Sequence, residues 1–169
     1  FKPTSESFHP VTAAGTNPNS PSLIGPWTES SVMTCEDCHA SDSSGANGPH
    51  GSTYTPILKM RYDRVQPNQE NATDYELCYS CHDRTSILAN QSFADHNKHI
   101  AEQNAACFVC HDAHGVAAAG VGDGTHPINF ATDYVTNSSG GRLEFIDDGA
   151  FAGRCYLTCH GKDHNPLSY

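Results

Sequence analysis

The sequence has little of what usually builds a protein core. Only 37% of its 169 residues are hydrophobic, 9% are aromatic, and there are one tryptophan and two methionines. A chain of this length has room for one domain, but so few apolar side chains exclude a large self-sufficient core. We therefore expect another component to fill the interior. Eight cysteines and eleven histidines make disulfides, metals or a large apolar cofactor the candidates.

Long apolar runs and positive charge are scarce as well. No stretch approaches the roughly 20 consecutive apolar residues that a transmembrane helix needs, so we expect no membrane insertion. Only nine lysines and arginines stand against nineteen acidic residues, which gives a net charge of −10. Such an acidic chain is a poor partner for nucleic acid and for anionic membrane surfaces.

The cysteines occur as four close pairs, and a histidine directly follows each pair. Three pairs have the spacing Cys-x-x-Cys-His, and the fourth has one more residue between its thiols. The pairs are Cys35 and Cys38, Cys78 and Cys81, Cys107 and Cys110, and Cys155 and Cys159, followed by His39, His82, His111 and His160. This pattern is typical of c-type haem attachment, because two thioether bonds hold the porphyrin edge while the adjacent imidazole reaches the iron. We predict four covalently bound haem c groups; at the fourth pair, the longer spacing leaves a free thiol pair or an attachment with altered geometry as alternatives.

Three alternative roles for paired cysteines fit the sequence less well. A structural zinc site gives no reason for a histidine directly after every pair. A disulfide within each pair would close only a tiny loop and would contribute little stability. A thioredoxin-like redox pair would be single and would lie among alternating strands and helices, a pattern that this sequence lacks. Haem attachment is therefore the prediction.

The haems are expected to replace the missing side-chain core. Each macrocycle buries a large apolar area, so we predict that the haem-free chain is largely unfolded. Residues 1–31 contain five prolines among serines, threonines and glycines, which predicts an extended N-terminal arm. The whole chain, residues 1–169, is predicted to form a single domain.

Regular secondary structure is predicted to be sparse. The fold class that we expect is mostly coil with short α-helices and one small β-hairpin. The predicted helical segments are 74–82 and 93–111, with a turn or two at 59–65, and the hairpin pairs 126–135 with 142–146.

The ligand on the second face of each iron decides between electron transfer and catalysis. An iron closed by two strong ligands mainly exchanges electrons, whereas an open face binds oxygen, nitrite or peroxide. Seven of the eleven histidines remain after the four in the motifs, which is more than four irons need. We therefore predict histidine on both faces throughout, and electron transfer rather than enzyme activity.

The candidates for this second, distal position are spread along the chain: His9, His50, His99, His114 and His126. His114 lies too close to His111 to cross to the other face of the same haem, so it should serve a different one. His96 and His99 share one face of the predicted helix, and His99 is the preferred ligand of the two. His164 is left open between a ligand and a surface residue.

Several short segments add a resemblance to a known family. They are Phe8-His9-Pro10-Val11, Gly48-Pro49-His50-Gly51, His96-x-x-His99, Cys-His-Asp-Ala-His-Gly115, His126-Pro-Ile-Asn-Phe130 and Cys-Tyr-Leu-Thr-Cys-His-Gly161. With the doubled Cys-x-x-Cys-His motifs, the chain resembles multihaem c-type cytochromes, and within them the OmcE-type tetrahaem extracellular cytochromes of metal-reducing bacteria. The resemblance implies subunits that polymerise into conductive filaments around a continuous stacked haem chain. It also implies a histidine that ligates a neighbouring subunit's haem, here His9 or, second, His114.

Location and partners follow from the same chemistry. Haem c is attached outside the cytoplasm and residue 1 is Phe1 rather than methionine, so we expect that a secretory signal has been removed. The resemblance places the protein outside the cell or on its surface, with the periplasm as the alternative. Its partners would be further copies, redox proteins or extracellular electron acceptors. The rival functions are a monomeric periplasmic shuttle and, less expected, a haem reductase of an oxyanion.

Overall fold

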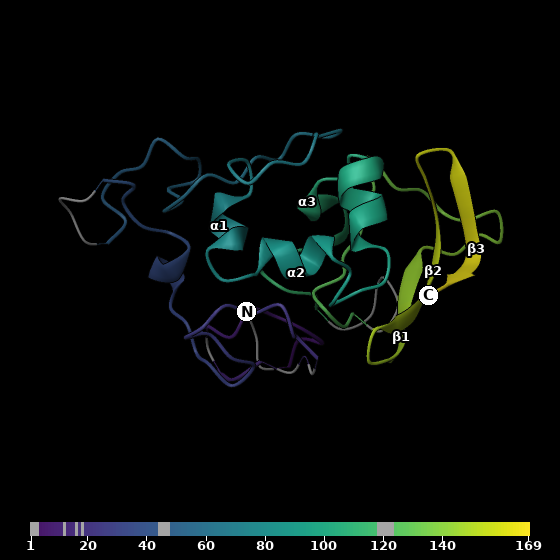
Figure 1. Ribbon diagram of the computed structural model, residues 1–169, viewed down its shortest axis with the longest axis horizontal. Helices are drawn as coiled ribbons and strands as arrows, with labels where there is room; N and C mark the ends of the chain where they lie inside the picture. Colours follow the sequence, from purple (N-terminus) through teal and green to yellow (C-terminus); the bar gives the residue numbers. More distant parts are fainter. Residues whose placement is uncertain (1–3, 12, 16, 18, 44–47, 118–123) are drawn as a thin grey trace.

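The computed structural model describes residues 4–11, 13–15, 17, 19–43, 48–117 and 124–169. Most of the described chain is coil, with short helical segments and one three-stranded sheet at one end of the molecule (Figure 1). The prediction of a coil-rich fold with short helices is therefore confirmed. None of the helices in these ranges has the length or apolar character needed to cross a membrane.

The helical segments are single turns. They are a 3-10 turn η1 (Cys35–Asp37), α1 (Glu76–Tyr79), α2 (Arg84–Leu88), a π-helical turn η2 (Lys98–Glu102) and α3 (Cys107–Cys110). Local capping fixes where some of them begin: the carboxylate of Asp83 accepts hydrogen bonds from the backbone N–H groups of Thr85 and Ser86 and caps α2. Three of the five turns, η1, α1 and α3, contain the first cysteine of a pair and so set the direction of its thiol.

The helix predicted over 93–111 is wrong as a continuous element. The chain forms η2, leaves the helical path and starts again at α3. Asn104 has a φ of 56°, a left-handed conformation that interrupts a helix. The side chain of Gln66 also accepts a hydrogen bond from the backbone N–H of Ala106, at 2.7 Å. The turn predicted at 59–65 is wrong too, because Lys59 donates its N–H to the carbonyl of Cys38 instead of forming a helix.

The sheet is antiparallel with the order β1-β2-β3. Its strands are β1 (Glu144–Gly149), β2 (Ala152–Cys159) and β3 (Lys162–Ser168). The predicted hairpin is wrong in its pairing: part of 142–146 does enter β1, but its partner is β2, with Phe145 opposite Cys155. The segment 126–135 bonds within itself and to α3 instead: Tyr134 donates its N–H to the carbonyl of Ala131, and Ala131 donates its own to the carbonyl of Val109.

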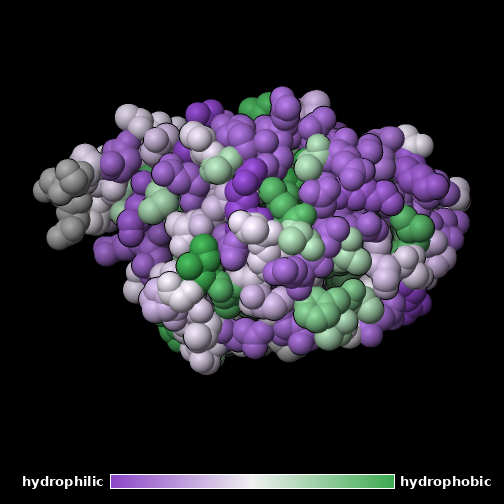
Figure 2. Space-filling view, in the orientation of Figure 1, coloured by the Kyte–Doolittle hydropathy of each residue, from purple (hydrophilic) through white to green (hydrophobic). Residues whose placement is uncertain are grey.

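Apolar side chains gather mainly beside the sheet. A buried cluster joins α3, the 128–135 segment and the inner faces of β1 and β2. Its members are Tyr75, Ala106, Phe108, Val109, Ile128, Phe130, Val135, Phe145, Cys155 and Leu157. Other buried apolar residues, such as Phe8, Met33 and Leu58, lie outside this cluster. The face in Figure 2 is mostly hydrophilic with small, separate hydrophobic groups, in keeping with so polar a chain.

The N-terminal residues lie against the rest of their own chain. Ser7 forms a bridge with Val116, Leu23 forms one with His82, and Ser7 and Phe8 are fully or almost fully buried. In Figure 1 this segment, in purple, runs beneath α1 and α2. The arm thus has an in-chain packing surface, and its docking on a second copy stays a prediction.

Candidate haem sites

Three of the four cysteine pairs lie on helical turns of the same construction. In each, the histidine after the pair donates its backbone N–H to the carbonyl of the first cysteine: His39 to Cys35 at 2.7 Å, His82 to Cys78 at 3.0 Å, and His111 to Cys107 at 2.9 Å. Residues three apart on a helical turn face the same side, so both thiols of each pair point to one edge. All eight cysteines are free thiols in the structure, which leaves them available for thioether bonds.

The fourth pair lies on a strand instead. Cys155 and Cys159 both belong to β2, where a rise of about 3.3 Å per residue separates their Cα atoms by roughly 13 Å. Cys155 is part of the buried apolar cluster, and burial raises its pKa to about 11. Cys159 ends the strand directly before His160. The fourth site therefore departs from the helical geometry, and Cys159 is the thiol placed beside its histidine.

Each motif histidine has another imidazole at a similar distance. The pairs and their ring-centroid distances are His39 and His114 at 6.1 Å, His82 and His9 at 6.2 Å, His111 and His96 at 6.4 Å, and His160 with His99 and with His164, both at 6.1 Å. Metal–imidazole bonds are about 2.0–2.1 Å long, so two rings that bind one metal from opposite sides have centroids about 6 Å apart. The spacing of all four sites fits two imidazoles on one iron.

Hydrogen bonds at Nδ1 prepare several of these rings for ligation. Nδ1 of His9 donates to the carbonyl of Ala113 at 2.8 Å, and Nδ1 of His39 to that of Pro56 at 3.1 Å. His99 and His111 make the same kind of bond, at 2.8 Å and 2.9 Å. A carbonyl only accepts, so Nδ1 carries the proton and the lone pair of each ring lies on Nε2. That tautomer, fixed by a second contact, leaves Nε2 free to bind a metal.

Burial also keeps the imidazoles of the inner sites neutral. It lowers the pKa of His82 to about 4, with a smaller contribution from the charge of His9. Burial likewise lowers the pKa of His96 to about 3, and it lowers the pKa of His111. At the fourth site, burial lowers the pKa of His164 to about 4. A neutral imidazole is the ligand form, so these residues do not need to lose a proton near pH 7 to bind iron.

The four sites follow one another in sequence order. Burial and then the charge of Cys81 raise the pKa of Cys38 to about 11, so the first and second thiol pairs are neighbours. The thiol of Cys107 donates a hydrogen bond to Cys78, which raises the pKa of Cys107 and lowers that of Cys78. Burial raises the pKa of Cys110 to about 12, with the charge of Cys155 next in size. Figure 1 agrees: η1 (blue), α1, α3 and β2 succeed one another along the long axis.

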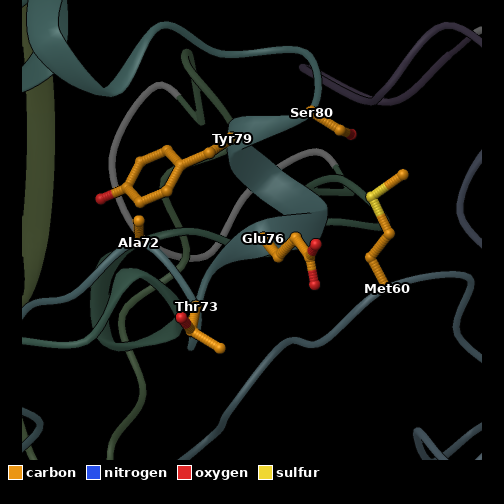
Figure 3. A pocket seen from close by; sticks show the side chains of 6 residues that line it. All are labelled: Met60, Ala72, Thr73, Glu76, Tyr79 and Ser80. Atoms are coloured by element: carbon orange, nitrogen blue, oxygen red, sulfur yellow. The ribbon is translucent and has the colours of Figure 1, made fainter.

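Two buried polar atoms and two cavities test whether haem fits. Among the described residues, Tyr75 Oη and His164 Nε2 are buried without a hydrogen-bond partner, a cost that a bound group with polar atoms or a metal would remove. A cavity of about 310 Å³ opens at the fourth site, lined by His99, His160 and His164. Another cavity of about 440 Å³ lies beside α1 and is lined by Met60, Glu76, Tyr79 and Ser80; in Figure 3, Glu76 and Ser80 extend toward the side of Met60, and Tyr79 points the other way. Donors, tautomers and spacing fit haem iron between paired imidazoles.

The distal candidates fall into two groups. His9, His99 and His114 each lie beside a motif histidine of their own chain. His50 and His126 are in no such pair: His50 is exposed in its loop, and Nε2 of His126 faces Asp147 at 3.3 Å. His126 acts instead through its backbone, since its carbonyl holds Nδ1 of His111.

His96 is the ligand candidate that the sequence pattern did not indicate. A straight helix places His96 on the same face as His99, which leaves only one of the two as a ligand. The π-helical turn η2 starts between them, at Lys98, and His96 faces His111 while His99 faces His160. The surplus of histidines over four irons was the signal that could have found it.

Comparison with known proteins supports the cofactor class. The family described as "Doubled CXXCH motif" matches residues 25–87, which include the first two motifs and less than half of the chain. No curated protein and no solved structure matches significantly. The doubled motif supports a multihaem c-type cytochrome that binds haem c covalently and transfers electrons.

Proposed function

We propose that the protein carries electrons through four bis-histidine haem c groups and does so as the subunit of an extracellular filament. The observation that carries the haem count and ligation is the set of four imidazole pairs at one common spacing, 6.1 to 6.4 Å between ring centroids. One such pair occurs at every cysteine motif. Two strong ligands on an iron favour electron exchange over substrate binding.

The residues that would hold each haem follow from the geometry. Cys35, Cys38, His39 and His114 would hold the first haem, and Cys78, Cys81, His82 and His9 the second. Cys107, Cys110, His111 and His96 would hold the third, and Cys155, Cys159 and His160 the fourth, with a distal imidazole from His99 or His164. When bound, haem supplies a one-electron Fe(III)/Fe(II) couple. The chain supplies neutral, oriented imidazoles and excludes open coordination positions.

The row of sites supports end-to-end assembly. The first motif lies toward one end of the long axis and the fourth at the other (Figure 1). Cys35 at the first and His160 at the fourth are exposed, so both terminal sites are accessible to a second copy. Joining such copies would extend the row of haems from subunit to subunit. An extracellular location, with further copies and electron acceptors as partners, belongs to the same proposal.

The proposed filament does not draw on His9 or His114 as the ligand of a neighbour's haem. His9 lies 6.2 Å from His82 and His114 lies 6.1 Å from His39, between ring centroids of the same chain. Each would therefore serve as a ligand in its own subunit, and contact between subunits would come through haem edges and the ends of the molecule.

Purified holoprotein tests the proposal in two steps. Intact mass and ferric absorption spectra should show four covalent haems, all low-spin; fewer haems or a five-coordinate iron would contradict the tetrahaem, bis-histidine part. Negative-stain microscopy and sedimentation then separate the filament from a monomeric periplasmic shuttle. Fibres support the filament, whereas a monomeric profile without fibres leaves only the shuttle. An oxyanion reductase would need the five-coordinate iron that the spectrum detects.

A further inference from the structure

Three imidazoles, rather than two, meet at the fourth site. The ligand atoms of His99, His160 and His164 all lie within 4.8 Å of one another. The ring centroids are 6.1 Å apart for His99 and His160, 6.1 Å for His160 and His164, and 6.3 Å for His99 and His164. Either His99 or His164 is thus at ligand spacing from His160.

The three rings come from separate elements and converge on one cavity. His99 belongs to η2, His160 to the turn between β2 and β3, and His164 to β3. They line a cavity of about 310 Å³ together with Lys98 and Lys162, whose charges would offset haem propionates. The cavity therefore offers three imidazoles, whereas a haem iron binds two.

His164 is an unusual residue to leave without a partner. It is 3% exposed, and its Nε2 makes no hydrogen bond, while Nδ1 lies 3.4 Å from the hydroxyl of Tyr169. A buried nitrogen without a partner is costly, and a metal would satisfy it. His99 is also oriented to bind a metal. Its Nδ1 donates a hydrogen bond to the carbonyl of Asp95, 2.8 Å away, so its Nε2 carries the lone pair.

We propose that His99 and His164 are interchangeable distal ligands of the fourth haem, so that either binds opposite His160 when the other leaves. The inference rests on the proposed function, since it requires haem at this site. In the exchange, one iron–imidazole bond breaks and another forms, and no electron or proton is transferred. Within the described residues, the first three motif histidines each have one imidazole partner at this spacing, so redundancy is confined to the fourth site.

The test compares His99→Ala, His164→Ala and the double variant as four-haem holoproteins. The ferric spin state, read by electron paramagnetic resonance and near-infrared absorption, reports whether an imidazole has been lost. Each single variant should keep all four irons low-spin, and the double variant should show one high-spin iron in four. His114→Ala is the matched control, because loss of the one partner of His39 should produce one high-spin iron by itself.

The outcomes separate this inference from the function beneath it. A high-spin iron in either single variant would show a fixed ligand and overturn the inference, as would a double variant that stays fully low-spin. Where an alanine variant does not load four haems, His99→Phe and His164→Phe keep the ring volume and remove the ligand nitrogen. If the unaltered protein has three haems with a separate metal ion at the three histidines, both the inference and the tetrahaem proposal fail. If it has four low-spin haems, only the inference is at risk.

Discussion

The first three candidate haem sites and the fourth are built on different kinds of backbone. A helical turn presents both thiols and the histidine of each of the first three motifs. At the fourth, a β-strand separates the thiols, and a two-residue turn presents the histidine. The first three have one nearby distal imidazole each, and the fourth has two. At the fourth site, the two thiols lie farther apart and more imidazoles are close to the motif histidine.

A second contrast separates the two ends of the molecule. The sheet end has a contiguous apolar cluster, whereas around the first site the described buried apolar residues, such as Met33 and Leu58, lie outside that cluster. We therefore expect haem burial to contribute relatively more to stability at the first site than at the fourth.

Removal of all haems should have the largest effect. We expect the haem-free chain, with all eight cysteines replaced by serine, to be largely unfolded by circular dichroism, since its stability depends on bound groups. Residual hydrogen-exchange protection should be confined to the apolar cluster around α3, β1 and β2. Native-like dichroism across the chain, or protection at the first motif instead, would break the contrast between the two ends.

Loss of single cysteines should distinguish the strand from the helical turns. Cys159→Ser should remove the fourth haem, whereas Cys155→Ser should retain it through Cys159 and His160. At the second motif, Cys78→Ser and Cys81→Ser should lower haem content to similar extents, because both thiols share one turn. Intact mass spectrometry of the four variants measures this. Equal losses from the two fourth-site variants would show that the two thiols contribute equally on the strand, as they do on the helical turn.

A feature of the fold or the site could be predicted from the sequence where it depends on residues that are close together in the chain. The cysteine–histidine motifs could be identified because attachment chemistry fixes residues within one turn. The break before α3 could not, since it depends on Gln66, far along the chain, bonding to Ala106. The hairpin of the fourth motif was missed because its turn is His160-Gly161, with φ of 42° and 77°, in place of the common Asn-Gly. The imidazole pairs depend on tertiary contacts that spacing cannot supply.

A core truncation tests the contribution of the apolar cluster. Val135 is 1% exposed within that cluster, and Val32 is 57% exposed outside it. Val135→Ala should lower the free energy of unfolding of the holoprotein by about 1–3 kcal/mol, and Val32→Ala should change it by less than about 0.5 kcal/mol. Denaturant unfolding followed by circular dichroism gives both values. Similar values for the two would mean that side chains add little beside the haems.

The smallest expected effect concerns the turn that presents His160. Gly161 has a φ of 77° and Gly141 one of 79°, and a Cβ at either would meet no atom within 4 Å. Alanine should therefore cost about 1–2 kcal/mol at each through backbone strain alone. Only Gly161→Ala should also alter the absorption and redox potential of one haem. A spectral change in Gly141→Ala, or none in Gly161→Ala, would mean that this turn does not position a ligand.

The most direct measurement of the central claim is an electron cryo-microscopy map of the holoprotein at a resolution that shows side chains. The account predicts four irons in sequence order along the long axis. His39 and His114 should flank the first, His82 and His9 the second, and His111 and His96 the third, with His160 and one of His99 and His164 at the fourth. A map in which any of these pairs is divided between two irons, or in which a motif lacks haem, would contradict it.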